Sequence, residues 1–414
     1  HHGHRYRHPI HHIRQLHWTY ASANELLPLA HRHPALLLCA DAAHQDVVHP
    51  SLRQVAVVRP SPSQGRGVKC TLYNYTMMKK IILFLVTTCL VGSHQFIKAQ
   101  ENKAQELGIW YDTELQTDFH GNYNHVNLLY LSAEYSLRNN LKFRAATISI
   151  ANTREERLLD DLQVFSNIED DNLPLALAVA GIEWQINDRH TLFMGIRNVN
   201  EDYFTSPITS LFTNSSCGIF PTLSCNLPIA NYPLASVGMH YAYSSQHFNL
   251  LSSIYNGRGY NRWAGRENVW KVFPKEDGIF FITQGEWSLS NGKYFLGGCL
   301  HTGTLQEPST KSTLWCYTEQ KISECFSLIA DYSHVFGKGC ECLDFAGLGL
   351  QYEQQNSTIG LFSDYARFCD NNEYATELTY KYQFYKSVFI QTSCHLISMS
   401  SLHPIGMIRL GIRL

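Results

Sequence analysis

The sequence has little charge imbalance and almost no long apolar run. Its 414 residues include 33 Lys and Arg against 35 Asp and Glu, a formal net charge of −2 at pH 7. Proteins that bind nucleic acid usually carry a basic excess, so the charge predicts no nucleic-acid partner. Apart from one shorter stretch, no run of about twenty apolar residues could cross a bilayer as a helix. A multi-helix membrane protein is therefore excluded.

Common catalytic and metal-binding motifs are also missing. G-x-S-x-G, the P-loop and H-E-x-x-H do not occur. Serines or threonines lie near His301 and His395 in the sequence, which chance alone explains in a chain rich in both. The cysteines after residue 100 lack zinc-type paired spacing, and Cys340-Glu341-Cys342 is too tight for a ligand pair. The sequence therefore predicts no enzyme, no cofactor and no metal.

A secretory signal peptide is the clearest local signal. The stretch "MMKKIILFLVTTCLVGSHQFIKAQ", which starts at Met77, has a basic pair, an apolar run and a small-residue end. We expect a signal peptide at 77–99 and a mature chain that begins at Gln100. Residues 1–76 are His-rich and show no sustained periodicity. We interpret them as an upstream extension that is unstructured or not translated. Residues 100–414 then form the exported domain.

The exported part alternates apolar and polar residues. In "NEYATELTYKYQFYKSVFIQTSCHLI", Leu378 and Tyr380 fall on one face of an extended strand, while Glu377, Thr379 and Lys381 fall on the other. This period of two recurs along the chain in about sixteen segments of roughly ten residues. The pattern predicts an all-β protein.

The connections between these segments favour a membrane barrel over a soluble sheet. Short turns such as Asn139-Asn140 and Tyr385-Lys386 alternate with long connections near 152–174, 201–233 and 258–277. Tight turns at one rim and long loops at the other are typical of outer-membrane barrels. We therefore expect a transmembrane up-and-down antiparallel β-barrel of about 16 strands, closed by the C-terminal strand "GMIRLGIRL".

Several stretches in order carry a family resemblance. "SSIYNGRGYN", "YFLGGCLHTGTL", the closing run quoted above and above all "SSCGIFPTLSCNLPIANYPLASVG" make the chain similar to the carbohydrate-selective porin family over about residues 105–414. The resemblance implies passive diffusion of small neutral sugars through the outer membrane of a Gram-negative bacterium. It also implies contact with outer-membrane lipid, insertion by the barrel assembly machinery, and a monomer or homotrimer.

The quoted stretch "SSCGIFPTLSCNLPIANYPLASVG", which contains Cys217 and Cys225, is expected to be a loop at or inside the barrel mouth. A Cys217–Cys225 disulfide could pin it, since export to an oxidising compartment permits the bond. Two unpaired loop cysteines are the alternative.

Substrate selectivity should reside on the face that points into the lumen. Charges of both signs suit a neutral, hydroxyl-rich solute, which donates and accepts hydrogen bonds, whereas rings of one sign select ions. Each charge could instead only solvate the wall or pair with a neighbour. Arg409 is expected to line the constriction and Arg413 to lie nearer the rim. The candidate lumen residues are Glu134, Arg144, Glu183, Arg197, Glu286, Glu319, Glu377, Lys381, Arg409 and Arg413.

Three functions remain open from the sequence. The first is a sugar-diffusing porin, the second a general or anion-preferring porin, and the third a soluble exported sheet protein that binds glycans. The barrel interpretation also predicts which positions face lipid. Charged substitutions should damage assembly at Leu378, Tyr380 or Ile390, and should be tolerated at Thr379 or Gln391.

Overall fold

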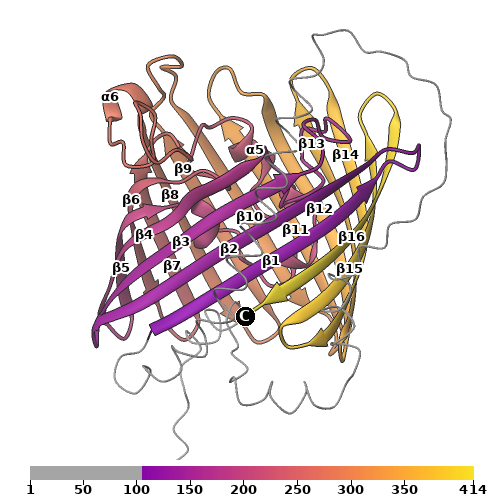
Figure 1. The fold of residues 1–414 in the computed structure, drawn as a ribbon, viewed down its shortest axis with the longest axis horizontal. Coiled ribbons are helices and arrows are strands. Elements are labelled where there is room, and N and C mark those ends of the chain that lie inside the picture. The colour runs from indigo at the N-terminus through magenta and orange to yellow at the C-terminus, as the bar shows by residue number, and fades with distance from the viewer. Residues whose placement is uncertain (1–104) are drawn as a thin grey trace, which may run out of the picture. The chain divides into compact units, whose positions relative to one another are not determined.

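The computed structural model describes residues 105–414, so the predicted signal peptide and the upstream extension lie outside the described residues. Residues 105–414 form a closed antiparallel barrel of sixteen strands in which each strand pairs with its neighbours in sequence (Figure 1). The predicted fold and strand number are confirmed. The strands are β1 (Gln105–Thr117), β2 (Tyr123–Arg138), β3 (Leu141–Asn152), β4 (Leu173–Asn187), β5 (His190–Arg197), β6 (Ser236–Ser244), β7 (Phe248–Asn256), β8 (Ile279–Leu289), β9 (Gly292–His301), β10 (Lys311–Lys321), β11 (Phe326–Phe336), β12 (Cys342–Gln354), β13 (Ser357–Phe368), β14 (Asn372–Tyr385), β15 (Val388–Ser398) and β16 (Leu402–Arg413).

The barrel closes between its first and last strands. Trp110 of β1 lies opposite Arg413 of β16, and the pairing continues to Thr117 opposite Gly406. The Ile109 N–H donates to the Leu414 carbonyl, and the Leu414 N–H donates back to the Ile109 carbonyl, both at 2.8 Å. The terminal strand therefore covers the edge that β1 would otherwise present to lipid, as the sequence predicted.

Short and long connections separate to opposite rims. Two-residue turns such as 139–140 and 355–356 lie at the lower rim of Figure 1, where β1 begins and β16 ends. The long connections 153–172, 198–235 and 257–278 all leave from the upper rim. This is the alternation that the sequence predicted.

The described helices all belong to these connections. They are η2 (Val199–Glu201), η3 (Thr209–Leu211), η4 (Ser215–Cys217), α5 (Pro221–Ser224) and α6 (Pro274–Asp277). No helix within residues 105–414 is long and apolar enough to cross a membrane.

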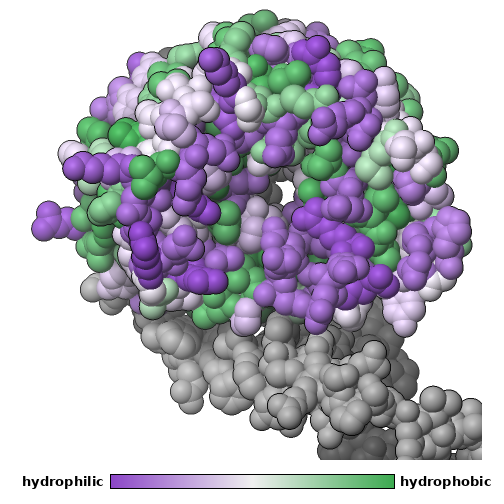
Figure 2. Space-filling model, turned by 90° about the horizontal axis from the view of Figure 1, so that it is seen from above, coloured by the Kyte–Doolittle hydropathy of each residue, from purple (hydrophilic) through white to green (hydrophobic). Residues whose placement is uncertain are grey.

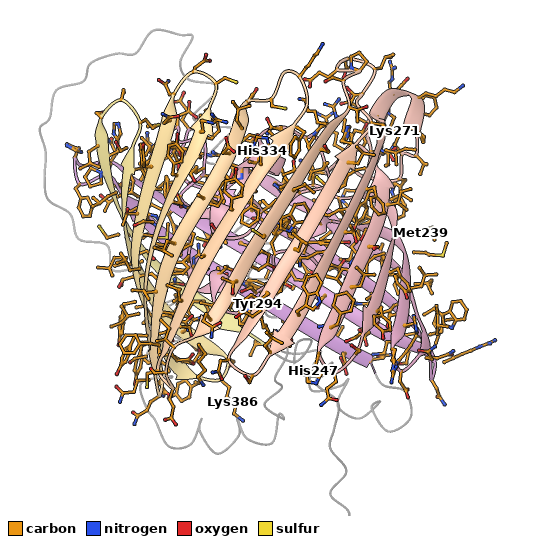
Figure 3. All side chains as sticks on the ribbon, turned by 180° about the vertical axis from the view of Figure 1, so that it is seen from behind. Met239, His247, Lys271, Tyr294, His334 and Lys386 are labelled. Carbon is orange, nitrogen blue, oxygen red and sulfur yellow. The ribbon has the colours of Figure 1, made fainter. Side chains whose placement is uncertain are left out.

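Side chains alternate between the two faces of the wall. On β14, Leu378 and Tyr380 are exposed on the outer face, while Glu377 and Thr379 are buried inside. Met239 of β6 projects from the outside in the same way (Figure 3). Exposed aromatic side chains such as Trp184 and Trp287 lie on the outer face near the lower rim, where an interfacial girdle would sit.

Two positions expected to tolerate charge are not open to the lumen. Thr379 and Gln391 do face inward, but both are buried beneath a connection that enters the barrel. The Gln391 Nε2 atom donates to the Leu211 carbonyl at 2.7 Å and to the Thr379 Oγ1 atom at 2.8 Å. A charge at either position would lose these partners, so the expected tolerance does not hold there.

A matched pair of substitutions tests the assignment of the two faces. Leu378→Arg places a cation on the outer face near mid-strand, where lipid would cost roughly 2 to 4 kcal/mol. Gln185→Arg adds the same side chain at an exposed position on the inner face of β4. We expect heat-modifiable, folded barrel to drop only for Leu378→Arg, measured by gel migration after detergent extraction. Equal yields for the two variants would contradict the assignment.

Candidate functional site

The connection between β5 and β6, residues 198–235, folds into the barrel, and we call it the lumen loop. It packs its aromatic residues against the inner wall instead of leaving them at the rim. Phe212 meets Phe362 of β13 with ring centroids 5.2 Å apart, and Phe220 meets Phe345 of β12 at 5.4 Å. These side chains belong to one buried apolar cluster that joins the loop to strands β7 to β13. One side of the lumen is thus filled by a compact core.

A buried carboxylate on β14 holds the middle of the lumen loop. Glu377 accepts the Thr213 N–H at 2.9 Å, the Asn214 N–H at 3.0 Å and the Thr213 hydroxyl at 2.9 Å. Asn214 also donates from its side chain to Asp364 at 3.0 Å. An ionised carboxylate is a strong acceptor for backbone N–H groups, so Glu377 is the central anchor of the loop.

The lumen loop also reaches deep into the barrel. The Ile208 N–H donates to Glu319 at 3.1 Å, and the Leu211 carbonyl accepts from Gln391 at 2.7 Å. Glu319 and Gln391 both lie toward the lower-rim ends of their strands, β10 and β15. Residues 208–211 therefore connect two distant parts of the wall and narrow the passage between them.

A second connection, residues 153–172 between β3 and β4, also turns inward, and we call it the acidic loop after its seven Asp and Glu residues. The Leu162 and Gln163 N–H groups donate to Glu373 of β14, each at 3.0 Å. Asn167 accepts from Arg409 of β16 at 2.8 Å. The two loops meet each other: the Asn167 N–H donates to the Thr213 carbonyl at 2.7 Å. Together they form one hydrogen-bonded assembly inside the barrel.

Four of the ten predicted lumen residues hold these loops. Glu319, Glu377 and Arg409 bind them as described, and Arg197 forms an ion pair with Asp202 of the lumen loop at 2.6 Å. Burial opposes ionisation of Asp202, but the charges of Arg197 and His240 outweigh it and lower the pKa of this carboxyl. All four predicted residues are buried. Arg409 does not line an open constriction, because it joins Glu114 to the acidic loop at 2.7 and 2.8 Å.

The other six predicted residues lie on the inner wall, and charges of opposite sign meet around all of them except Lys381. Arg144 of β3 lies 3.0 Å from Glu183 and 3.6 Å from Glu134, which also contacts Lys142. Across the barrel, Lys293 of β9 lies 2.9 Å from Glu286 of β8. The wall therefore offers both hydrogen-bond donors and acceptors, as predicted.

Arg413, Lys381 and two aromatic rings form a band on the adjacent wall. Arg413 binds both oxygens of Asp112 at 2.8 and 2.9 Å and lies over the Trp110 ring, 4.0 Å from its centroid. The Lys381 amine lies over the Phe389 ring at 4.1 Å. Arg413 is about one quarter exposed, so it is accessible where Arg409 is not. Arg413 lies nearer the rim, as expected, but it is more accessible than Arg409, contrary to expectation.

An opening remains beside the two loops. Seen from above, the space-filling view shows a narrow gap through the middle of the barrel, with hydrophilic side chains along much of its border (Figure 2). Among residues 105–414, no group of three or more His, Cys, Asp or Glu side chains is arranged to hold a metal ion. The geometry is that of a narrow, polar passage.

The predicted Cys217–Cys225 bridge is not formed in the structure. Both residues are free thiols. Cys217 is buried in the apolar cluster of the lumen loop, whereas the Cys225 thiol contacts the Leu162 carbonyl of the acidic loop at 3.7 Å. The short helix α5 lies between them and turns them to different surroundings, and burial raises the pKa of Cys225 to about 11.

Comparison with solved structures identifies the architecture. OprB of Pseudomonas putida superposes with a TM-score of 0.65 at 13% sequence identity, over 79% of this chain and 97% of that chain. The chain has the OprB fold. A loop-deletion form of OmpT from Vibrio cholerae follows at TM-score 0.51 and 10% identity, over 76% of this chain and 100% of that chain. An anion-selective porin from Comamonas acidovorans reaches 0.50 and 12%, over 75% and 99%.

No protein-family model and no curated protein sequence matches the chain. The likeness to OprB confirms the predicted resemblance at the level of the fold.

The acidic loop was not predicted as part of the site. Its partners on the barrel wall, Glu114 and Glu373, both lie on the inner face. The alternation of inward and outward residues along each strand is enough to predict this facing. What the sequence does not reveal is the pairing, because Glu373 is 211 residues from Leu162. The strongest available signal was the density of Asp and Glu between two strands.

Removing the Glu377 carboxylate should release the lumen loop. Glu377→Ala leaves two buried N–H groups without their acceptor, at about 1 to 3 kcal/mol each. We expect higher single-channel conductance and faster proteolysis within 198–235, with the barrel still folded. Glu353→Ala on β12 is the matched control, since the described contact of Glu353 is with Gln351 at 3.3 Å. Unchanged conductance and proteolysis would show that Glu377 is not the anchor.

The attachment of the acidic loop should weaken with rising pH. Burial, with the neighbouring charge of Glu373, raises the pKa of Asp161 from 3.8 to about 8. Between these two values the released loop gives up a proton that the packed loop keeps, so attachment loses free energy as pH rises and stays constant above about pH 8.

Limited proteolysis of residues 153–172 at about pH 5 and pH 9 measures this effect. Wild-type protein should be cut faster at the higher pH, and Asp161→Asn should remove most of the difference. Asp160→Asn changes an exposed neighbour and should behave like wild type. A pH dependence that survives in Asp161→Asn would assign it to another group.

Proposed function

We propose that the protein is an outer-membrane porin through which carbohydrates diffuse passively and selectively. One observation carries the proposal: most cations of the open inner wall lie beside a carboxylate. Arg144 pairs with Glu183, Lys293 with Glu286, and Arg413 with Asp112. Such a wall has little net field to select ions, yet it presents fixed N–H donors and carboxylate acceptors. A sugar ring, which carries hydroxyl groups all round, can use both.

The two inward loops support this proposal. They narrow the passage and so bring a solute close to the wall, where hydrogen bonds to charged groups are worth about 1.5 to 3 kcal/mol each. A passage held by buried anchors keeps these contacts in place. The inner wall then acts as a binding surface for a permeating solute, and the function needs no catalytic group.

An anion-preferring porin is the second candidate, and Lys381 favours it. Among the described residues, Lys381 has no carboxylate within ion-pair distance, and its amine lies over an aromatic ring. One unbalanced cation near the passage would attract anions. The solved anion-selective porin from Comamonas acidovorans has a similar fold, which is compatible with either candidate.

Liposome swelling separates the two candidates. Proteoliposomes are tested with neutral mono- and disaccharides and with anionic and cationic solutes of equal size. Faster entry of neutral sugars supports the proposal, and faster entry of anions supports the second candidate. Equal rates for all charges indicate a general porin. If the extracted protein neither migrates in a heat-modifiable way nor permeabilises liposomes, the membrane assignment itself is wrong.

Breaking one charge pair should convert the passage toward anion selectivity. Asp112→Asn keeps the shape of a side chain that is 1% exposed but leaves Arg413 without its counter-charge. We expect the chloride-to-potassium permeability ratio, from reversal potentials in a salt gradient, to rise severalfold. Glu106→Gln removes the same charge at an exposed position near the lower rim and should change the ratio less. An equal response of both variants would mean that net charge, and not pairing on the wall, sets selectivity.

A further inference from the structure

Three cysteines, Cys340, Cys342 and Cys369, gather where the lumen loop meets the upper ends of β12 and β13. Cys342 begins β12 and lies opposite Phe368, which ends β13. Cys340 and Cys369 lie just beyond these strands, in two different connections at the upper rim. The Cys369 N–H donates to the Glu341 carbonyl at 2.9 Å, so the pairing of the two strands continues past their ends.

The geometry brings Cys340 and Cys369 within reach of each other. The Cys369 Sγ atom lies 2.9 Å from the Cys340 carbonyl oxygen. Bond lengths then place this sulfur within about 5.7 Å of the Cys340 Cα atom. Both cysteines are free thiols in the structure, so the bond requires their side chains to rotate toward each other. Gly339 precedes Cys340, and its own φ of +66° is a backbone conformation that most other residues avoid.

We propose that Cys340 and Cys369 form a disulfide that joins the two upper-rim connections. The oxidant is an external disulfide of the glutathione type. The exposed Cys369 thiolate attacks it and forms a mixed disulfide while one small thiol leaves. The Cys340 thiolate then attacks the Cys369 sulfur and releases the second small thiol. Two cysteine thiols are oxidised, one external disulfide is reduced, and the two protons end on the released thiols.

The order of attack follows from accessibility. Cys369 is exposed, whereas Cys340 is buried. Burial also raises the pKa of the Cys340 thiol, which makes it the slower nucleophile. A protein at the cell surface meets an oxidising medium in which such a bond persists.

The other cysteines of the described chain are less suited to this pairing. Cys342 is fully buried, so its thiol is not accessible to an external oxidant. Cys225 directs its thiol to the acidic loop. Cys316 and Cys394 are exposed at outward positions in mid-strand on β10 and β15.

The bond would lie next to an anchor of the lumen loop. The Asn226 side chain accepts the Glu341 N–H at 2.6 Å and donates to the Cys342 carbonyl at 2.6 Å. Lys311 donates to the Asn226 carbonyl at 3.1 Å. Joining Cys340 to Cys369 therefore restrains the backbone that holds residue 226, and the redox state of the pair sets how firmly this end of the lumen loop is held.

Differential alkylation of the full chain tests the proposal. Folded protein is incubated with oxidised glutathione, denatured in N-ethylmaleimide, reduced, and labelled with iodoacetamide before mass spectrometry. Cys340 and Cys369 should carry the second label and appear in one linked peptide without reduction, while Cys316 and Cys394 carry the first. A linked peptide that joins Cys225 to Cys342 or to Cys217, or first label on both Cys340 and Cys369, would overturn the proposal.

Thermal unfolding gives a second readout. Oxidised wild-type barrel should lose its heat-modifiable form at a higher temperature than Cys340→Ser or Cys369→Ser, and dithiothreitol should lower wild type to the level of these variants. The variants themselves should not respond to dithiothreitol, and Cys316→Ser should behave like wild type. Wild-type protein whose unfolding temperature is the same with and without dithiothreitol would contradict the role of the bond.

Discussion

The rest of the structure depends on the requirement that no backbone N–H or C=O group be left unpaired in lipid. A sheet meets this requirement only when its last strand pairs with its first, as β16 does with β1. Closure fixes two distinct faces on every strand, so a period of two in the sequence becomes outside and inside. The apolar residues then face lipid, and the polar residues of all sixteen strands face one enclosed space.

A space enclosed by sixteen strands is too wide for wall side chains to fill, which leaves room for connections to enter it. The lumen loop and the acidic loop carry backbone N–H groups into the barrel. There these groups lose water as a hydrogen-bond partner and need another acceptor. Carboxylates on the strands accept them, as Glu377 does for Thr213 and Glu373 does for Leu162. Inward-facing charge therefore serves folding in addition to the proposed permeation, since each buried carboxylate both requires and supplies a partner.

The sequence was sufficient for the barrel but not for its interior. Alternation and turn spacing predicted the sixteen strands, their facing and the two rims, because these depend on neighbours in the chain and on the solvent of each face. The contacts of Glu319, Glu373, Glu377 and Arg409 with the loops join residues 111 to 242 positions apart, and no local pattern specifies them. For the same reason the cysteines were paired by closeness in sequence, whereas the structure separates Cys217 from Cys225 and brings Cys369 beside Cys340.

Arg409 and Arg413 show why position along a strand decides the role of a lumen charge. They are the same residue type, on the same face of β16, roughly 13 Å apart along the strand. Arg409 lies at the height of the acidic loop and is buried between Glu114 and Asn167, while Arg413 lies below the loops and keeps part of its surface open. Loss of Arg409 would alter permeation through the position of a loop, and loss of Arg413 would alter it through contact with the solute. A change in flux alone does not distinguish these causes. A lumen charge in such a barrel must therefore be interpreted by its neighbours, because charges that contact the two loops support them, whereas charges beyond their reach stay open to the lumen.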